Sequence, residues 1–125
     1  MKLLDTTVAV DHLRGHGLAT RVIEQSIEAD ERILASELVR FELLSGVRAT
    51  EVPALEEFFG ILTWVPVTED VTRVAGALAH SYRAAFSGIG TADYLIAATA
   101  ILLEVSLLTT NVRDFPMIKE LKAAY

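Results

Sequence analysis

Residues 91–111, TADYLIAATAILLEVSLLTTN, predict a helix followed by a strand, and this unit indicates the fold class. The Ala-rich apolar pattern can take its N-cap from Thr91. The run VSLLTTN at 105–111 is too short for a helix and has the composition of a buried strand. Similar short apolar runs are KLLD (2–5), RILAS (32–36) and TWVPV (63–67). Because short buried strands that alternate with helices favour a parallel sheet covered on both faces, we predict an α/β fold, a three-layer α/β/α sandwich.

Three other helices have recognisable ends in the sequence. Ser36 can cap a helix over 37–47, which Gly46 ends or interrupts, and Thr68 with the two acids after it opens a helix that runs to 86. Pro116 suits the first position of a last helix over 117–125. No repeat, low-complexity tract or linker divides the chain, so we expect one domain over residues 1–125.

The composition excludes several classes of protein. Hydrophobic residues make up 52 % and charged residues 22 %, which is typical of a compact globular chain. With no cysteine, the chain forms neither a disulfide nor a thiolate zinc site, and it has no cysteine nucleophile. Asp5 stands too early for a signal peptide, and the longest apolar run, 94–103, is about half the roughly 20 residues of a membrane span. We expect a soluble cytoplasmic protein without a membrane partner.

The net charge of −6 argues against a simple electrostatic nucleic-acid binder. That objection weakens if the acids hold metal ions, because a bound divalent cation inverts the local field. The positions of the acids therefore matter more than their sum.

Four acids lie either just after a predicted strand or in a helix next to one. Asp5 follows the first strand, Asp114 follows the fourth, Asp93 lies in the first turn of the helix before it, and Glu42 lies in the helix after the second strand. In this fold class ligands bind at the carboxyl ends of the strands, so the four side chains can converge. Taken singly, Asp5 and Asp114 can be helix caps and Asp93 can complement a helix dipole. Glu42 has no such explanation, because it lies in the middle of a helix, on an apolar face, where neither a cap nor the dipole applies. Burying it there without a partner costs several kcal/mol.

Carboxylates without histidine or cysteine suit a hard cation, Mg²⁺ or Mn²⁺, rather than zinc. Mg²⁺ takes one or two carboxylates directly and keeps several waters, so the remaining acids would orient water or hold a second ion. This chemistry serves the hydrolysis of phosphodiesters. The sequence has no P-loop, dinucleotide-binding or serine-hydrolase motif. A receiver domain has the same length and fold class, but the adjacent acidic pair expected after its first strand and its late-strand lysine are absent.

Three segments in this order resemble the PIN domain family, in particular the VapC-type toxins of toxin–antitoxin pairs. LLDTTVAVDHLRG resembles the opening D-T-[SN] motif with Asp5 as its acid, and SELVRFELLSGV resembles the E-L-x-x-G segment with Glu42 as its acid. TADYLIAATAILLEVSLLTTNVRDF resembles the D-x-x-I-A-A-T-A…L-x-T-x-N…D-F pattern, which contributes Asp93, Thr110, Asn111 and Asp114. Thr7 stands where the family more often has Ser or Asn, and the short C-terminal region places a fifth edge strand in doubt.

The resemblance implies a PIN-like parallel sheet of four to five strands and a Mg²⁺- or Mn²⁺-dependent endoribonuclease. It implies a homodimer, inhibited by a cognate VapB-like antitoxin that inserts a basic tail into the acidic site, in some cases as a hetero-oligomer. Carried over by position, Asp5 and Asp93 are metal ligands, while Glu42 and Asp114 complete a catalytic set of four acids. Thr6, Thr110 and Asn111 are then supporting or phosphate-proximal groups. Two alternatives remain open: a catalytically silent PIN-like subunit that acts through partners, and a metal-dependent DNA nuclease.

Overall fold

The computed structural model describes residues 1–125 and is built on one sheet of four parallel strands in the order β3-β2-β1-β4. The strands are β1 (Lys2–Leu4), β2 (Ile33–Ser36), β3 (Thr63–Val65) and β4 (Ser106–Leu108). In the centre of the sheet Leu3 pairs with Leu34 on one side and with Leu107 on the other. The predicted parallel α/β/α architecture is confirmed, with four strands.

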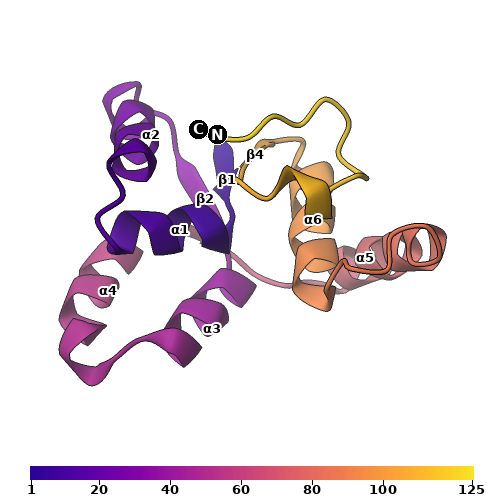
Figure 1. The fold of residues 1–125 in the computed structure, drawn as a ribbon, viewed down its shortest axis with the longest axis horizontal. Coiled ribbons are helices and arrows are strands. Elements are labelled where there is room, and N and C mark those ends of the chain that lie inside the picture. Colours follow the sequence, from indigo (N-terminus) through magenta and orange to yellow (C-terminus); the bar gives the residue numbers. More distant parts are fainter.

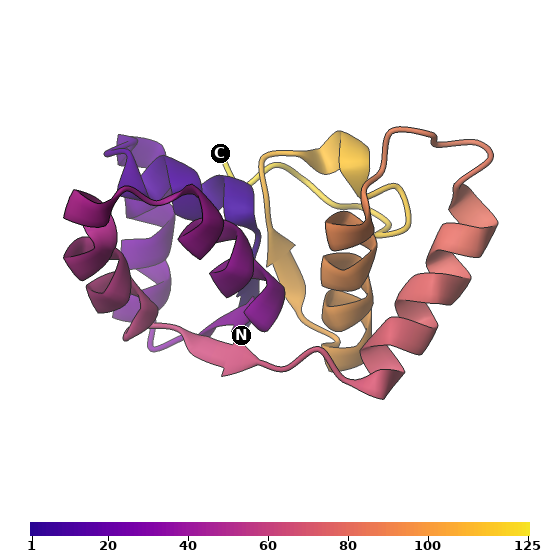
Figure 2. The ribbon, with the colours of Figure 1, turned by 90° about the horizontal axis from the view of Figure 1, so that it is seen from below.

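Helices cover both faces of the sheet. Figures 1 and 2 show α5 and α6 on one side and the first four helices on the other. The α-helices are α1 (Thr6–Leu13), α2 (Gly17–Glu28), α3 (Glu37–Gly46), α4 (Val52–Phe59), α5 (Glu69–Tyr82) and α6 (Thr91–Leu103), and the short 3-10 helices are η1 (Ala49–Glu51) and η2 (Val112–Asp114). None of the helices is both long and apolar enough to cross a membrane.

The helix predicted at the start of residues 91–111 is α6, and it lies directly beside the sheet. Its residues 96–100 are all buried, and three of these five are alanines. Small side chains allow the helix backbone to lie close to the strands, which holds its first turn at a defined height above the end of the sheet. That turn contains Asp93, so tight packing of the helix positions a carboxylate.

Of the three helix caps predicted at Ser36, Thr68 and Thr91, two are confirmed and one is wrong. The Ser36 hydroxyl accepts the Leu38 N–H at 3.2 Å, and the Thr68 hydroxyl accepts the Val71 N–H at 3.2 Å. Thr91 does not cap α6; it is the first helical residue, and the N-cap is Gly90, which provides no side-chain hydrogen bond. Asp93, at the third helical position, lies near the Gly90 N–H, which lowers the pKa of its carboxyl group in part.

The predicted helix over 117–125 is absent, and the segment is irregular. Phe115 and Met117 are 1 % and 8 % exposed, and burial of side chains two positions apart does not match a helical face. Glu120 has a φ of 61°, in the left-handed region, which also interrupts a helix. The tail runs back to the sheet instead, where the Ala124 N–H donates to the Thr109 carbonyl at 2.8 Å, and it forms no fifth strand.

Candidate active site

An acidic cleft of about 420 Å³ lies at the carboxyl ends of the central strands. It is lined by Asp5, Thr6, Thr7, Val10, Asp11, Glu42, Asp93 and Thr110. Three of the four acids singled out in the sequence, Asp5, Glu42 and Asp93, therefore face one space. Asp114 does not line the cleft, but its charge raises the pKa of both Asp5 and Asp93, so it belongs to the same electrostatic cluster.

Asp5 directly follows β1 and caps α1, so its place is set by a strand-to-helix junction. Its Oδ1 accepts the Thr6 N–H at 2.8 Å, which confirms the capping interpretation. Its Oδ2 accepts the Thr109 hydroxyl at 2.6 Å and the Thr7 hydroxyl at 3.1 Å. The residue is only 3 % exposed, and burial raises the pKa of Asp5 in spite of these three donors. The carboxylate is thus fixed in orientation, in surroundings that disfavour its charged form.

Asp93 faces Asp5 from the first turn of α6. Burial and the charges of Asp114 and Asp5 raise the pKa of Asp93 to about 6, and the Gly90 N–H offsets part of this rise. The dipole of α6 favours a negative charge in this turn, as the sequence indicated. Burial, together with the neighbouring carboxylates, nevertheless raises the pKa of Asp93, so its charged form is disfavoured in this site.

Glu42 reaches the cleft from α3 and is half-buried. Its Oε1 accepts the Thr6 hydroxyl at 2.7 Å, a contact between residues 36 positions apart. Glu42, for which the sequence suggested no partner, therefore has one uncharged hydrogen-bond donor. No cation pairs with it.

Asp114 ends η2 and accepts a hydrogen bond from the Asn111 side-chain amide. Because no helix follows at Pro116, the capping interpretation of Asp114 is wrong. Asn111 is in turn held by its N–H, which donates to the Thr109 hydroxyl at 3.0 Å. Thr109 thus connects Asp5 to the turn that carries Asp114.

Sequence reasoning missed Thr109 and Asp11. Thr109 is fully buried, donates the shortest hydrogen bond to Asp5 and follows β4 directly, so its position at a strand end was the available signal. Asp11 lies one turn after Thr7 on α1 and lines the cleft, which the i, i+4 spacing could have indicated. The Tyr125 hydroxyl donates to Asp11 at 2.5 Å, so the end of the chain is held to a residue that lines the cleft.

The cleft has no positive charge of its own. The four ion pairs of the structure are Met1–Glu31, Lys2–Glu31, Arg40–Glu37 and Arg73–Glu69, none of which includes a cleft acid. Oxygen ligands of this kind suit a hard divalent cation. No three acids form a ready metal cage, so an ion would take one or two carboxylates and complete its coordination with water, as Mg²⁺ commonly does. The donor set therefore fits a hydrated Mg²⁺ or Mn²⁺ ion.

The fold and the cleft define a class of protein: an α/β/α domain with a cluster of carboxylates at the carboxyl end of a parallel sheet. The chain belongs to the PIN domain family, whose model matches residues 2–121. The family suggested by the three sequence segments is therefore confirmed.

Relatives with known names match the chain over its whole length. It is 56 % identical to Ribonuclease VapC19 of Mycobacterium tuberculosis over 125 residues, which cover 100 % of both chains. It is 36 % identical to Ribonuclease VapC10 of the same organism, over 100 % of this chain and 93 % of that one. A solved structure, VapBC2 from Rickettsia felis bound to a DNA fragment from their promoter, matches 98 % of this chain and 96 % of the solved chain at 25 % identity, with a TM-score of 0.81.

Proposed function

We propose that the chain is a Mg²⁺- or Mn²⁺-dependent endoribonuclease and the toxin of a type II toxin–antitoxin pair, with residues 1–125 acting as one nuclease domain. The observation that carries the proposal is the acidic cleft, in which fixed carboxylates face one another without a compensating cation. The full-length likeness to two curated ribonucleases supports RNA as the substrate. An RNA substrate favours action in the cytoplasm.

Asp5 and Asp93 would hold the ion directly, because they are the two acids at which burial and like charge raise the pKa. A nearby cation relieves both effects. When bound, the ion acidifies an attacking water and stabilises charge on the leaving oxygen. Glu42 and Asp114 would complete the catalytic set by orienting water or binding a second ion. They are anchored by Thr6 and Asn111 respectively.

Neutral donors do the positioning in this site. The hydroxyls of Thr7 and Thr109 fix one oxygen of Asp5, and the Thr6 N–H fixes the other. Because these donors carry no charge, they orient the carboxylate without neutralising it. Thr110 lines the cleft beside them and would contribute a group close to a substrate phosphate.

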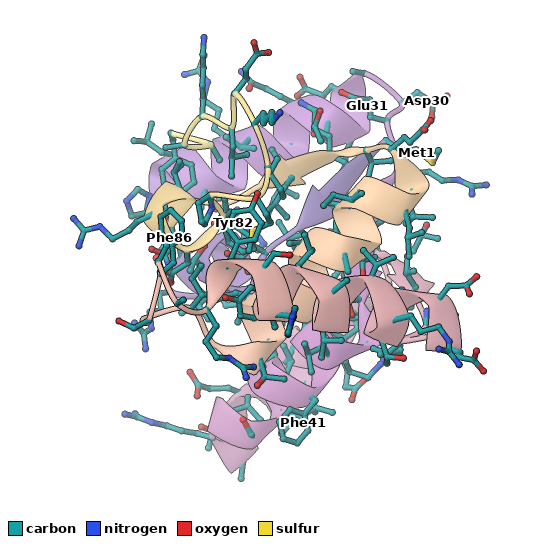
Figure 3. The ribbon with its side chains drawn as sticks, turned by 90° about the vertical axis from the view of Figure 1, so that its right-hand side faces the viewer. Met1, Asp30, Glu31, Phe41, Tyr82 and Phe86 are labelled. Carbon is teal, nitrogen blue, oxygen red and sulfur yellow. The ribbon has the colours of Figure 1, made fainter.

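The proposed protein partners are a VapB-like antitoxin and a second copy of the chain. An antitoxin that inserts a basic tail would supply the positive charge that the cleft lacks, and the Rickettsia felis VapBC2 structure supports a partner of this kind. The outer face of α3 supports self-association. Phe41 and Leu44 on this helix are 67 % and 43 % exposed, and Figure 3 shows Phe41 directed away from the molecule. Exposed apolar groups of this size are typical of protein interfaces.

The test is cleavage of a defined RNA by the purified chain, with and without Mg²⁺, for the wild type and for Asp93→Asn. The variant should lose activity by about 100-fold or more, the scale of removing one electrostatic contact at a reacting centre. Asp70→Asn is a matched control, because Asp70 lies in the first turn of α5, as Asp93 does in α6, but does not line the cleft. It should cleave like the wild type.

The alternatives give different results in the same assay. A silent subunit would leave the RNA intact at any Mg²⁺ concentration, and a DNA nuclease would cleave the DNA of the same sequence in preference. Undiminished Mg²⁺-dependent cleavage by Asp93→Asn would contradict the assignment of the site. Growth arrest on expression, abolished by Asp5→Ala, is the corresponding observation in cells.

A further inference from the structure

Asp11 lines the acidic cleft but lies apart from the acids that would hold the ion. It stands six residues after Asp5, an axial rise of about 9 Å along α1, whereas two ligand oxygens of one Mg²⁺ ion lie at most about 4 Å apart. Asp11 is also not among the carboxylates whose charges most raise the pKa of Asp5 or Asp93. The geometry therefore separates Asp11 from the proposed metal ligands.

The side chain of Asp11 is held in a defined orientation. Its Oδ2 accepts the Tyr125 hydroxyl at 2.5 Å, while its other oxygen accepts no hydrogen bond from the chain and the residue forms no ion pair. The Ala124 N–H donates to the Thr109 carbonyl at 2.8 Å, which holds the neighbouring tyrosine. The His16 ring packs against that of Tyr125, with 5.2 Å between centroids, where the end of the chain returns to α1 (Figure 2). One carboxylate oxygen thus remains free in a fixed place.

The face of α1 that carries Asp11 also carries Thr7 and Val10, at i, i+3 and i+4, and all three line the cleft. The Thr7 hydroxyl donates to Asp5 at 3.1 Å, so this face begins at the proposed metal ligands and continues beyond them. The cleft of about 420 Å³ is of the size of small-molecule pockets, and Val10 is the one apolar residue of its lining. The cleft therefore has room for a nucleotide beside the ion.

The chemistry of a carboxylate restricts what Asp11 can bind on that nucleotide. An ionised carboxylate only accepts hydrogen bonds, so its free oxygen requires a donor. The phosphates of RNA have no donor, and Asp11 repels their charge. The 2′-hydroxyl does donate, and it lies on the ribose next to each phosphate, whereas the donors of the bases lie farther from the backbone. This hydroxyl is also the group by which proteins distinguish RNA from DNA.

We propose that Asp11 accepts the 2′-hydroxyl of a ribose that flanks the scissile phosphate, and that Tyr125 is the positioning residue that holds Asp11 for this contact. The inference rests on the proposed ribonuclease function and extends it to the choice of RNA over DNA. The charge that keeps phosphates away from this part of the cleft favours the neutral ribose, and Val10 offers an apolar surface to its carbon atoms.

The experiment is a double-mutant cycle between Asp11 and the RNA. Cleavage of a defined RNA is compared with cleavage of the same RNA in which fluorine replaces one 2′-hydroxyl beside the cleaved bond, each flanking ribose in turn. Fluorine keeps the ribose conformation but cannot donate. At one of the two riboses it should lower kcat/KM of the wild type about 10-fold to 100-fold, the scale of a hydrogen bond to a charged group. For Asp11→Ala the change should stay within about twofold. General effects of the lost negative charge act on both RNAs and cancel in the ratio.

Three further variants test the positioning and the specificity of the effect. Tyr125→Phe keeps the ring and removes the donor, so the cost of the fluorine should fall to about threefold to tenfold. Asp11→Asn keeps an acceptor for Tyr125, and its cost should also be smaller than that of the wild type, because a neutral hydrogen bond is weaker. Asp70→Asn removes the same charge at a residue that does not line the cleft and should show the wild-type cost. Mg²⁺ binding, measured by calorimetry, should be the same for the wild type and Asp11→Ala.

The outcomes separate this inference from the proposed function. If Asp93→Asn abolishes cleavage while the fluorine costs Asp11→Ala as much as the wild type, the ribonuclease assignment stands and the role of Asp11 is wrong. If Asp11→Ala loses Mg²⁺ affinity by tenfold or more, Asp11 is a metal ligand and the proposal is overturned. A change in the preferred base at the cleavage site, with the cost of the fluorine unchanged, would place the contact on a base and overturn the 2′-hydroxyl assignment.

Discussion

Asp93→Asn should make the metal-free protein more stable while it removes activity. In the folded state burial and the charges of Asp114 and Asp5 raise the pKa of Asp93 from 3.8 to about 6. The native state therefore binds more protons than the unfolded state between these two values. The free energy of unfolding then falls as the pH rises through this window. Asparagine cannot ionise, so the variant should lack this fall.

The magnitude follows from the pKa. A rise of about 2 units corresponds to about 3 kcal/mol at most, since each unit is about 1.4 kcal/mol. Asp93 is only half-buried, and solvent screening reduces this to about 1–2 kcal/mol. Loss of the favourable helix-dipole contact costs about 0.3–1 kcal/mol in the opposite direction. We therefore expect a net gain of about 1 kcal/mol at pH 7.5, or roughly 3–4 °C in Tm for a chain of this size.

The assay is urea unfolding in the presence of a chelator at pH 4.0 and pH 7.5. At pH 4.0 Asp93 is largely protonated, so the wild type and the variant should have nearly equal stability. Asp70→Asn, in the first turn of α5, should be slightly destabilised at pH 7.5 and show no gain. A variant that is no more stable than the wild type at pH 7.5, or a difference that is the same at both pH values, would refute the reasoning.

Three other substitutions test the packing around the site. Gly76→Ala in α5 should stabilise the fold by about 0.4–1 kcal/mol in urea unfolding, because the added Cβ meets no atom within 4 Å and the unfolded chain loses freedom. Thr109→Val removes the 2.6 Å donor to Asp5; kcat/KM should fall about 10-fold to 100-fold and the acid limb of the pH–rate profile should move to higher pH. Tyr125→Phe removes the donor to Asp11 and should cost about 1–2 kcal/mol, with faster hydrogen exchange of the amides in the C-terminal tail.

The fold was predictable where local sequence and tertiary packing agree. The stretch 91–111 has an apolar, Ala-rich helix pattern and then a short apolar strand. Both form because their apolar residues are buried, the helix at 96–100 and the strand at Leu107 and Leu108. At the C-terminus the two disagree. The segment after Pro116 can start a helix, but burial of Phe115 and Met117 against the core holds it in an irregular path that no local pattern encodes.

The site was predictable to the extent that strand ends locate it. Asp5 and Asp93 could be placed because parallel strands bring their carboxyl ends to one edge of the sheet. Their supporting contacts could not, because these join residues distant in the chain: Thr109 and Asp5 are 104 positions apart. The same holds for Glu42, whose partner Thr6 lies 36 positions away. Hydrogen bonds of this kind follow from the fold and not from spacing.

The choice of donors around the acids distinguishes this cleft from an ordinary network of ion pairs. Arginine or lysine would hold Asp5 and Glu42 equally firmly, but it would also neutralise them and occupy the cleft. Threonine hydroxyls fix the same carboxylates and leave their charge intact, at a cost in stability that the raised pKa of Asp93 records. A cleft whose carboxylates have no cation beside them requires one from outside the chain. The proposed metal ion and the proposed basic tail of an antitoxin supply it in the same place, so one arrangement of threonines and acids accounts for both activity and its inhibition.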